Sequence, residues 1–124
     1  MKYVVLLLCL VLVGGVALAQ GQGDAVQRGQ AVFEDHCAQC HRANGEGLPD
    51  TFPALNKNPF VLGDPKPVIA TVLNGRKGSL GQMPVWKDKL DDEQIAAVVN
   101  YIRQAWSNRA APVTPAIVAA TRGK

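Results

Sequence analysis

The sequence predicts a small all-α fold of three to five helices, and two patterns carry this prediction. Apolar residues follow Ile95 at offsets of three, four and seven, which is the spacing of one face of a helix. Elsewhere, glycines and prolines separate the periodic segments, and no stretch is convincing as a strand. We therefore expect helices joined by long loops.

Capping residues mark the first two helices. Asp24 is a good N-cap for the first, which carries Gly29 in its interior. A glycine inside a helix costs about 1 kcal/mol relative to alanine, so we expect another helix to approach closely there. Asp64 followed by Pro65 is typical of a second helix start, and Gly75 marks the end of that helix.

The third helix has the clearest start signal. In Asp91-Asp92-Glu93-Gln94, the glutamine follows the acidic N-cap by three residues, as in a capping box. The apolar face of this helix extends to Trp106. Residues 42–63 and 76–90 are expected to be loops, the first because glycine and proline recur throughout it.

The most specific motif is Cys37-Ala38-Gln39-Cys40-His41. Two residues between the cysteines place both sulfurs on one side of a helical turn, where each can form a thioether bond to a haem vinyl group. The histidine can then bind the iron from one face. The alternatives are a thiol redox pair or part of a zinc site, but the chain offers neither a βαβ pattern nor enough further ligands. We therefore expect one covalently attached haem c, with the helices wrapped around it.

Met83 is the candidate for the opposite axial position. The chain has two methionines, Met1 and Met83, and the second lies in the loop before Pro84. A thioether sulfur is a soft ligand that suits haem iron. The alternative is a buried core methionine. His36 adjoins Cys37 too closely to reach the other haem face, and we interpret it as a surface residue or a contact of the haem edge.

The N-terminus predicts export. Residues 3–13 are almost entirely apolar, and Ala17-Leu18-Ala19 matches an A-x-A cleavage signal. We expect a signal peptide over residues 1–19, a haem-binding domain over 20–108, and a flexible tail with alanine and proline over 109–124. The protein would then work in the periplasm or on the outer face of the cytoplasmic membrane. The alternative is that the apolar run is retained as a membrane anchor.

The charge balance argues against nucleic acid as a partner. The formal net charge of +3 at pH 7 is a mild excess, and no basic run accompanies it. Five cationic residues near Met83 in the sequence could instead form a positive rim for an acidic protein, or simply a solvated surface. They are Lys57, Arg76, Lys77, Lys87 and Lys89.

Together these features resemble a class I cytochrome c of the small bacterial monohaem type, related to the mitochondrial one. The resemblance spans about residues 24–108, and the haem motif and the later Met-Pro loop are specific in combination. The matching residues are Gly29 and Phe33, Cys37-Ala38-Gln39-Cys40-His41, Asn44-Gly45-Glu46-Gly47, Phe52-Pro53-Ala54-Leu55, Val72-Leu73-Asn74-Gly75, Gln82-Met83-Pro84 and Tyr101-Ile102-Arg103.

The resemblance implies roles for five residues around the iron. Cys37 and Cys40 would carry the thioethers, and His41 and Met83 would be the two metal ligands. The carbonyl of Pro53 would accept a hydrogen bond from the outer ring nitrogen of the histidine, which fixes the imidazole and tunes its basicity.

It also implies packing contacts. Gly29 and Phe33 would contact the helix that begins at Asp91, near Tyr101 and Ile102. Leu55 and Trp86 would line the haem pocket, although the tryptophan suits an ordinary core equally well.

The function implied is that of a one-electron carrier, because two axial ligands leave the iron no open position for a substrate. The protein would be a monomer that shuttles electrons between respiratory-chain or periplasmic partners, such as a dehydrogenase and a terminal oxidase, and not an enzyme itself. One alternative is the cytochrome c subunit of a periplasmic dehydrogenase or reductase complex. Another is a gas-binding or peroxidatic haem protein, which requires Met83 to be labile.

Overall fold

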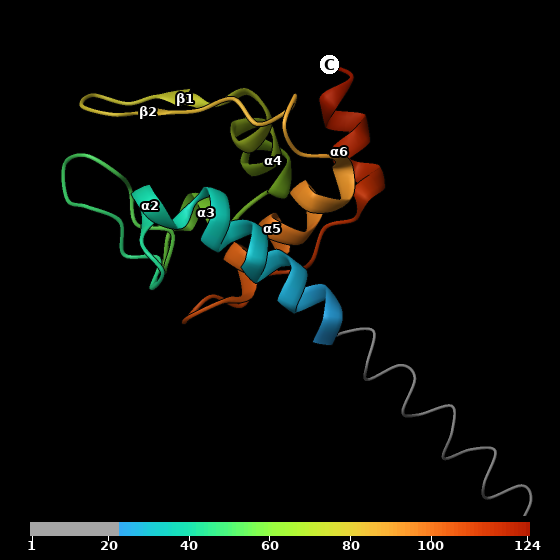
Figure 1. The fold of residues 1–124 in the computed structure, drawn as a ribbon, viewed down its shortest axis with the longest axis horizontal. Helices are drawn as coiled ribbons and strands as arrows, with labels where there is room; N and C mark the ends of the chain where they lie inside the picture. Colours follow the sequence, from blue (N-terminus) through green and yellow to red (C-terminus); the bar gives the residue numbers. More distant parts are fainter. Residues whose placement is uncertain (1–22) are drawn as a thin grey trace, which may run out of the picture.

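The computed structural model describes residues 23–124, so the expected signal peptide at 1–19 lies outside the described residues. Helices dominate this part of the chain, which confirms the all-α fold class (Figure 1). Four helices exceed one turn: residues 23–36, α4 (Pro65–Asn74), α5 (Asp92–Gln104) and α6 (Pro115–Arg122). Two more, α2 (Ala38–His41) and α3 (Pro59–Leu62), are single turns of 4 residues.

Local sequence signals set the starts of α4 and α5 as predicted, whereas Asp24, the expected N-cap of the first helix, lies inside the helix at 23–36. The Asp64 carboxylate accepts a hydrogen bond from the amide of Lys66 at 3.0 Å, with Pro65 at the first position of α4. Asp91 and Gln94 form the expected capping box, in which each side chain accepts from the other residue's backbone amide, at 2.8 and 3.0 Å. Each helix within residues 23–124 is too short or too polar to span a bilayer.

Regular structure also differs from the expectation in both predicted loops and at the end of α5. Residues 42–63 include the turn α3, and residues 76–90 include an antiparallel hairpin of β1 (Arg76–Lys77) and β2 (Gln82–Met83). Strands of 2 residues are too short to produce a periodic signal in the sequence. Helix α5 ends before Trp106, whose φ of 55° is incompatible with a right-handed helix.

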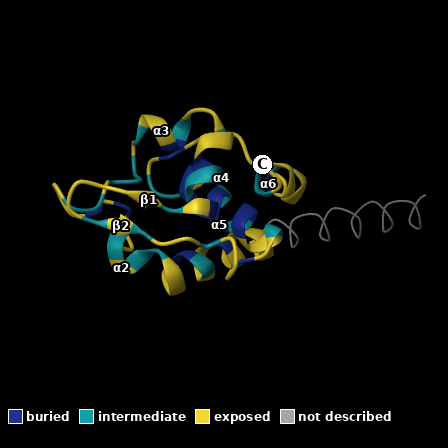
Figure 2. Ribbon diagram, turned by 90° about the horizontal axis from the view of Figure 1, so that it is seen from above, coloured by how far each residue is buried: buried dark blue, intermediate teal, exposed yellow. Residues whose placement is uncertain are grey.

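The core lies where the helix at 23–36, α4, α5 and α6 pack together. Figure 2 shows buried residues concentrated on α4 and α5 in the middle of the molecule. Phe33, Ile69, Leu73, Ile95 and Val99 are each fully buried. The hairpin and the loop after α2 extend away from this core on one side (Figure 1).

The C-terminal segment is not the flexible tail that its composition suggests. Thr114 caps α6 by accepting from the amide of Ile117, and the helix packs on both α4 and α5. Val113 and Val118 are almost fully buried, at 4% and 0% exposure. Two valines at this spacing are enough to anchor a short helix, although prolines and small residues make the surrounding sequence resemble a linker.

Arg122 fastens the end of α6 to the start of α5. Its guanidinium donates to the Asp92 carboxylate at 2.7 Å and to the carbonyl of Leu90 at 2.9 Å, and it also donates to the carbonyl of Lys87. The segment between the hairpin and α5 is thereby tied to the C-terminal helix.

The helix at 23–36 crosses α5 at Gly29. A Cβ at this position would lie 2.3 Å from the carbonyl oxygen of Ala97 and 3.0 Å from the Cβ of Tyr101, so the two backbones meet where only glycine fits. One turn later, the rings of Phe33 and Tyr101 have centroids 5.3 Å apart. The expected packing of Gly29 and Phe33 is therefore confirmed, and it brings residues 37–41 next to α5.

We expect Gly29→Val to lower the free energy of unfolding by about 1–3 kcal/mol or more, because the branched side chain must push the two helices apart. Denaturant unfolding monitored by circular dichroism measures this loss. Gly23→Val is the matched control, since a Cβ at Gly23 meets no atom within 4 Å. Equal stability of the two variants would contradict the close crossing.

Candidate haem site

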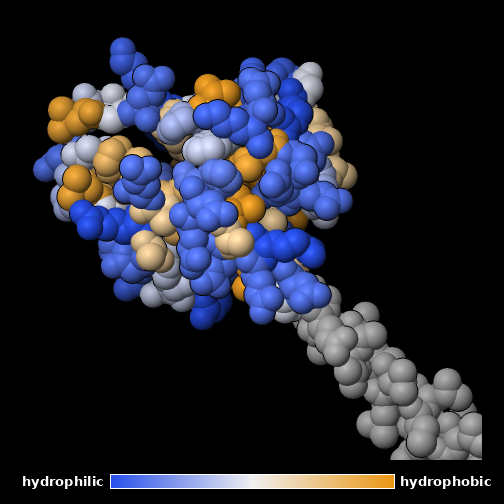
Figure 3. All heavy atoms as spheres, in the orientation of Figure 1, coloured by the Kyte–Doolittle hydropathy of each residue, from blue (hydrophilic) through white to orange (hydrophobic). Residues whose placement is uncertain are grey.

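A cavity of about 800 Å³ lies between α2, α3, α4, α5 and the hairpin. Figure 3 shows a gap in the surface on the side where the hairpin and the loop after α2 extend. Most of the cavity wall is apolar, and Leu55 and Trp86 both line it, as expected. The other apolar lining residues include Phe33, Val61, Val68, Val72, Val98 and Ile102.

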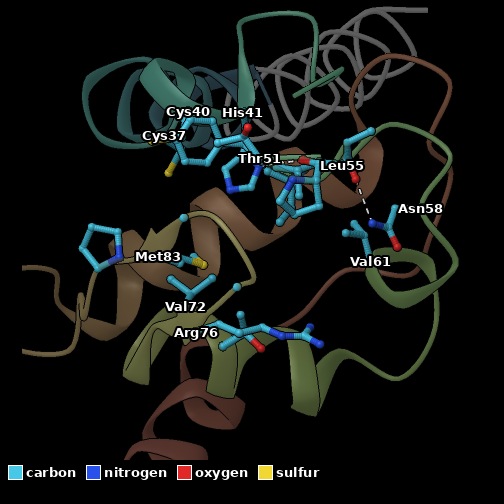
Figure 4. Close-up of a pocket in the computed structure, with 18 of the residues that line it drawn as sticks. Cys37, Cys40, His41, Thr51, Leu55, Asn58, Val61, Val72, Arg76 and Met83 are labelled. Carbon is cyan, nitrogen blue, oxygen red and sulfur yellow. Dashed lines mark hydrogen bonds between the residues drawn. The ribbon is translucent and has the colours of Figure 1, made fainter. Parts of the chain in front are cut away.

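The motif cysteines lie on one side of the cavity (Figure 4). Both are free thiols, and the backbone amide of His41 bonds to the carbonyl of Cys37 at 3.0 Å in the α2 turn. Burial, and secondarily the neighbouring Cys40, raises the pKa of the Cys37 thiol to about 11. A reactive redox pair or a zinc site needs a thiolate near neutral pH. Within residues 23–124, no group of three or more His, Cys, Asp or Glu side chains is placed to hold a metal ion.

His41 is oriented by a backbone carbonyl. Its Nδ1 lies 2.9 Å from the oxygen of Pro53, as the resemblance implies. Because a carbonyl can only accept, Nδ1 carries the proton and Nε2 keeps a free lone pair. Burial lowers the pKa of the imidazole, and the hydrogen bond to Pro53 opposes this effect only in part. The histidine is thus held as a neutral ring with one nitrogen available to a metal.

Met83 faces His41 across the cavity in Figure 4. It is half-buried, packs against the hydrophobic core, and ends β2. Gly75, between α4 and β1, has a φ of +70°, and a Cβ there would lie 2.4 Å from the carbonyl oxygen of Met83. This close approach holds the end of β2, which carries Met83, against the C-terminal end of α4.

His36 is exposed, and it also lines the cavity. Its ring lies against Trp86, with centroids 5.1 Å apart, and the Lys89 ammonium lies 5.3 Å from the centroid of the same tryptophan. Of the two interpretations of His36, a contact at the edge of the cavity fits this placement.

Two buried polar residues hold the cavity walls, and sequence reasoning assigned neither a role. Asn108 donates to the carbonyls of Leu55 at 2.9 Å and Ile102 at 2.7 Å, and it accepts from the amide of Lys57 at 2.7 Å. No local pattern singles out this asparagine in the sequence.

Arg103 is the second of these residues, at 2% exposure. It donates to the carbonyls of Val61, Gly63 and Ala111, at 2.7, 2.9 and 3.0 Å. A signal for its burial does exist, because it follows Ile95 by eight residues and so falls on the apolar face of α5.

Comparison with known proteins decides the family. The family model described as cytochrome c oxidase, cbb3-type, subunit III matches residues 24–102. The chain belongs to the cytochrome c family. It is 34% identical over 114 residues to cytochrome c-552 of Thermus thermophilus, which covers 82% of this chain and 72% of that protein. Membership means that the protein binds haem c covalently and takes part in electron transport.

Two further relatives are subunits of dehydrogenases. The chain is 39% identical over 117 residues to the gluconate 2-dehydrogenase cytochrome c subunit of Pantoea cypripedii, covering 86% of this chain and 26% of that protein. It is 36% identical over 98 residues to the cytochrome c subunit of the quinone alcohol dehydrogenase of Gluconobacter oxydans, covering 73% and 20%. The chain therefore spans about a quarter or less of the length of these two relatives.

The cavity of this cytochrome c fits its cofactor. Its size lies within the range of pockets that bury a large organic ligand. Two thiols separated by two residues, an imidazole with a free nitrogen, and a thioether on the far side are donors suited to haem and its iron.

We expect Asn108→Ala to lower the free energy of unfolding by about 1–3 kcal/mol for each backbone group left buried without a partner. Chemical denaturation measures the loss. Asn74→Ala is the control, because the Asn74 amide is exposed and bonds only to the carbonyl of Ala70 within its own helix; we expect it to change stability by no more than about 0.5 kcal/mol. Similar values for the two variants would show that Asn108 does not hold the cavity wall.

Proposed function

We propose that this cytochrome c carries single electrons through a haem attached to Cys37 and Cys40, with His41 and Met83 as the axial ligands. The observation that supports this most directly is the placement of an imidazole and a thioether on opposite sides of one apolar cavity. Bound haem c supplies an iron that gains or loses one electron. The chain's own residues set how readily it does so.

His41 and Met83 have different tasks in this proposal. The bond to the Pro53 carbonyl holds the His41 ring in one tautomer and one orientation, so that Nε2 presents its lone pair without rearrangement. The Met83 sulfur is a soft, weakly basic donor, and a His/Met pair raises the reduction potential of haem iron. The apolar walls, including Leu55 and Val98, exclude water from the space between these two ligands.

If His41 and Met83 fill both axial positions of the iron, the protein can transfer electrons but cannot bind a substrate at the metal. An iron bound by His41 and Met83 has no open position for oxygen or a substrate, which disfavours the gas-binding and peroxidatic alternatives. Partners would meet the protein at the cavity edge, where the exposed Lys89 lies over Trp86 and Lys87 is exposed nearby. We propose that these lysines attract an acidic redox protein, and that the protein works after export directed by residues 1–19.

A second candidate function is that of a cytochrome c subunit bound to a dehydrogenase. The gluconate 2-dehydrogenase and quinone alcohol dehydrogenase subunits among its relatives favour this reading. Gel filtration of extracts from the source cells, followed by haem staining, separates the two functions. Elution at about 13 kDa or below supports a free carrier, and elution with a larger dehydrogenase activity supports the subunit.

Covalent attachment at the motif predicts that acidified acetone leaves the haem on the polypeptide. Thioether bonds survive this treatment, whereas haem held only by ligation is extracted. The double variant Cys37→Ser/Cys40→Ser should release all its haem, and each single variant should retain one bond. Extraction from the unchanged protein would overturn the proposed attachment.

Met83→Ala should lower the reduction potential and allow the reduced protein to bind carbon monoxide, because the soft sixth ligand is lost. Redox titration and the carbon monoxide difference spectrum measure the two effects. Gln82→Ala is the control, since it changes the preceding exposed residue of β2. An unchanged potential in Met83→Ala would rule out ligation by this residue.

A further inference from the structure

Among the residues of 23–124 that line the cavity, Arg76 is the one lysine or arginine. The other titratable side chains of the lining are His36, Glu46 and Asp50, together with the cysteines and histidine of the motif. The Glu46 carboxylate already accepts a hydrogen bond from the Asn56 amide at 3.0 Å. Within the part of the chain that the structure describes, the cavity therefore has a single lysine or arginine side chain on a wall that is mostly apolar.

The hairpin and α3 position the Arg76 side chain. In the antiparallel ladder, Arg76 lies directly opposite Met83, and residues opposite one another project to the same face of a sheet. The guanidinium carbon lies 5.6 Å from the centroid of the Phe60 ring, at the start of α3. Figure 4 shows this side chain extending toward the side of the cavity where Asn58 and Val61 lie, away from Cys37.

Arg76 has no anionic partner within residues 23–124. The salt bridge found in this part of the chain joins Arg122 to Asp92, far from the hairpin in sequence. Contact with the face of Phe60 leaves the five N–H donors at the edge of the guanidinium free to bind an anion in the same plane. The position thus combines a fixed positive charge with unused donors on the cavity rim.

We propose that Arg76 binds a propionate carboxylate of haem c. The two propionates of haem project from the edge opposite the two groups that form thioethers. Cys37 and Cys40 hold the latter edge in the proposed function, so the carboxylates would lie on the side toward which Arg76 extends. A guanidinium matches a carboxylate through two parallel hydrogen bonds, which are short and charge-assisted.

This contact makes Arg76 a positioning residue. The ladder that carries Met83 also carries Arg76, so one pair of strands sets both the sixth ligand and the grip on the carboxylate. A positive charge beside the haem also favours the reduced, less positive iron, which raises the reduction potential. The inference rests on the proposed seating of the haem between the motif and Met83.

Resonance Raman spectroscopy tests the contact through the bending mode of the propionates, whose frequency falls when a hydrogen bond to the carboxylate is lost. We expect this mode to move to lower frequency in Arg76→Gln and by a smaller amount in Arg76→Lys. Lys77→Gln is the matched control, because it removes the same charge from the next residue of β1, which does not line the cavity. The reduction potential should also fall further in Arg76→Gln than in Lys77→Gln.

An unchanged mode in Arg76→Gln, or equal changes in Arg76→Gln and Lys77→Gln, overturns the proposal. If Arg76→Gln does not fold, Arg76→Met decides, because methionine keeps an unbranched side chain but has no N–H donor. An unchanged mode in that variant also overturns the proposal. The weak red-edge absorption band of methionine ligation is recorded in every sample. Its absence from the unchanged protein, or loss of haem to acidified acetone, would mean that the proposed ligation or attachment has failed, and not the Arg76 contact alone.

Discussion

The contact between two backbones at Gly29 and Ala97 is the constraint on which the rest of this cytochrome c depends. It sets the angle at which the first described helix crosses α5, and the haem motif begins one residue after that helix ends. Phe33 extends the contact by packing on Tyr101 and Trp106, with ring centroids 5.3 and 5.4 Å away. The position of the two cysteines relative to Val98 and Ile102, which line the cavity from α5, is therefore decided outside the cavity itself.

The irregular segments are held by a different kind of interaction. Most of residues 42–63 lie outside helices and strands, so their buried backbone groups need other hydrogen-bond partners. Backbone bonds within the loop supply some of these partners, such as the pairing of Leu48 with Phe52. Asn108 and Arg103 supply others from the C-terminal part of the chain, by donating to carbonyls of the loop and of α3. A buried arginine surrounded by carbonyl oxygens keeps its charge solvated without a carboxylate. The loop is thus held in part by side chains far from it in sequence.

Local signals in the sequence were enough to predict the helices that begin with clear capping residues. The capping box at Asp91 and the Asp64-Pro65 start act over three or four residues, so they can be recognised without knowledge of the fold. Helix α6 could not be predicted in this way, because its stability comes from burying Val118 against α4 and α5 rather than from its own periodicity.

The residues of the site also differ in whether adjacent sequence or the three-dimensional fold places them. The motif at 37–41 was recognisable because five adjacent residues carry its chemistry, and the hydrogen bond from His41 to Pro53 followed from the resemblance. The placement of Arg76 on the cavity wall depends on a two-residue ladder that brings it opposite Met83. Such a register leaves no trace in composition or periodicity, so only the three-dimensional structure relates the two residues.

The acceptor for His41 has a consequence for how this protein tolerates mutation. Because the oxygen belongs to the main chain of Pro53, replacing the side chain at that position cannot by itself remove the hydrogen bond. A carboxylate or hydroxyl in the same place would be lost by a single nucleotide change. A substitution at position 53 therefore leaves the orientation of the imidazole unchanged unless it also moves the backbone of the loop.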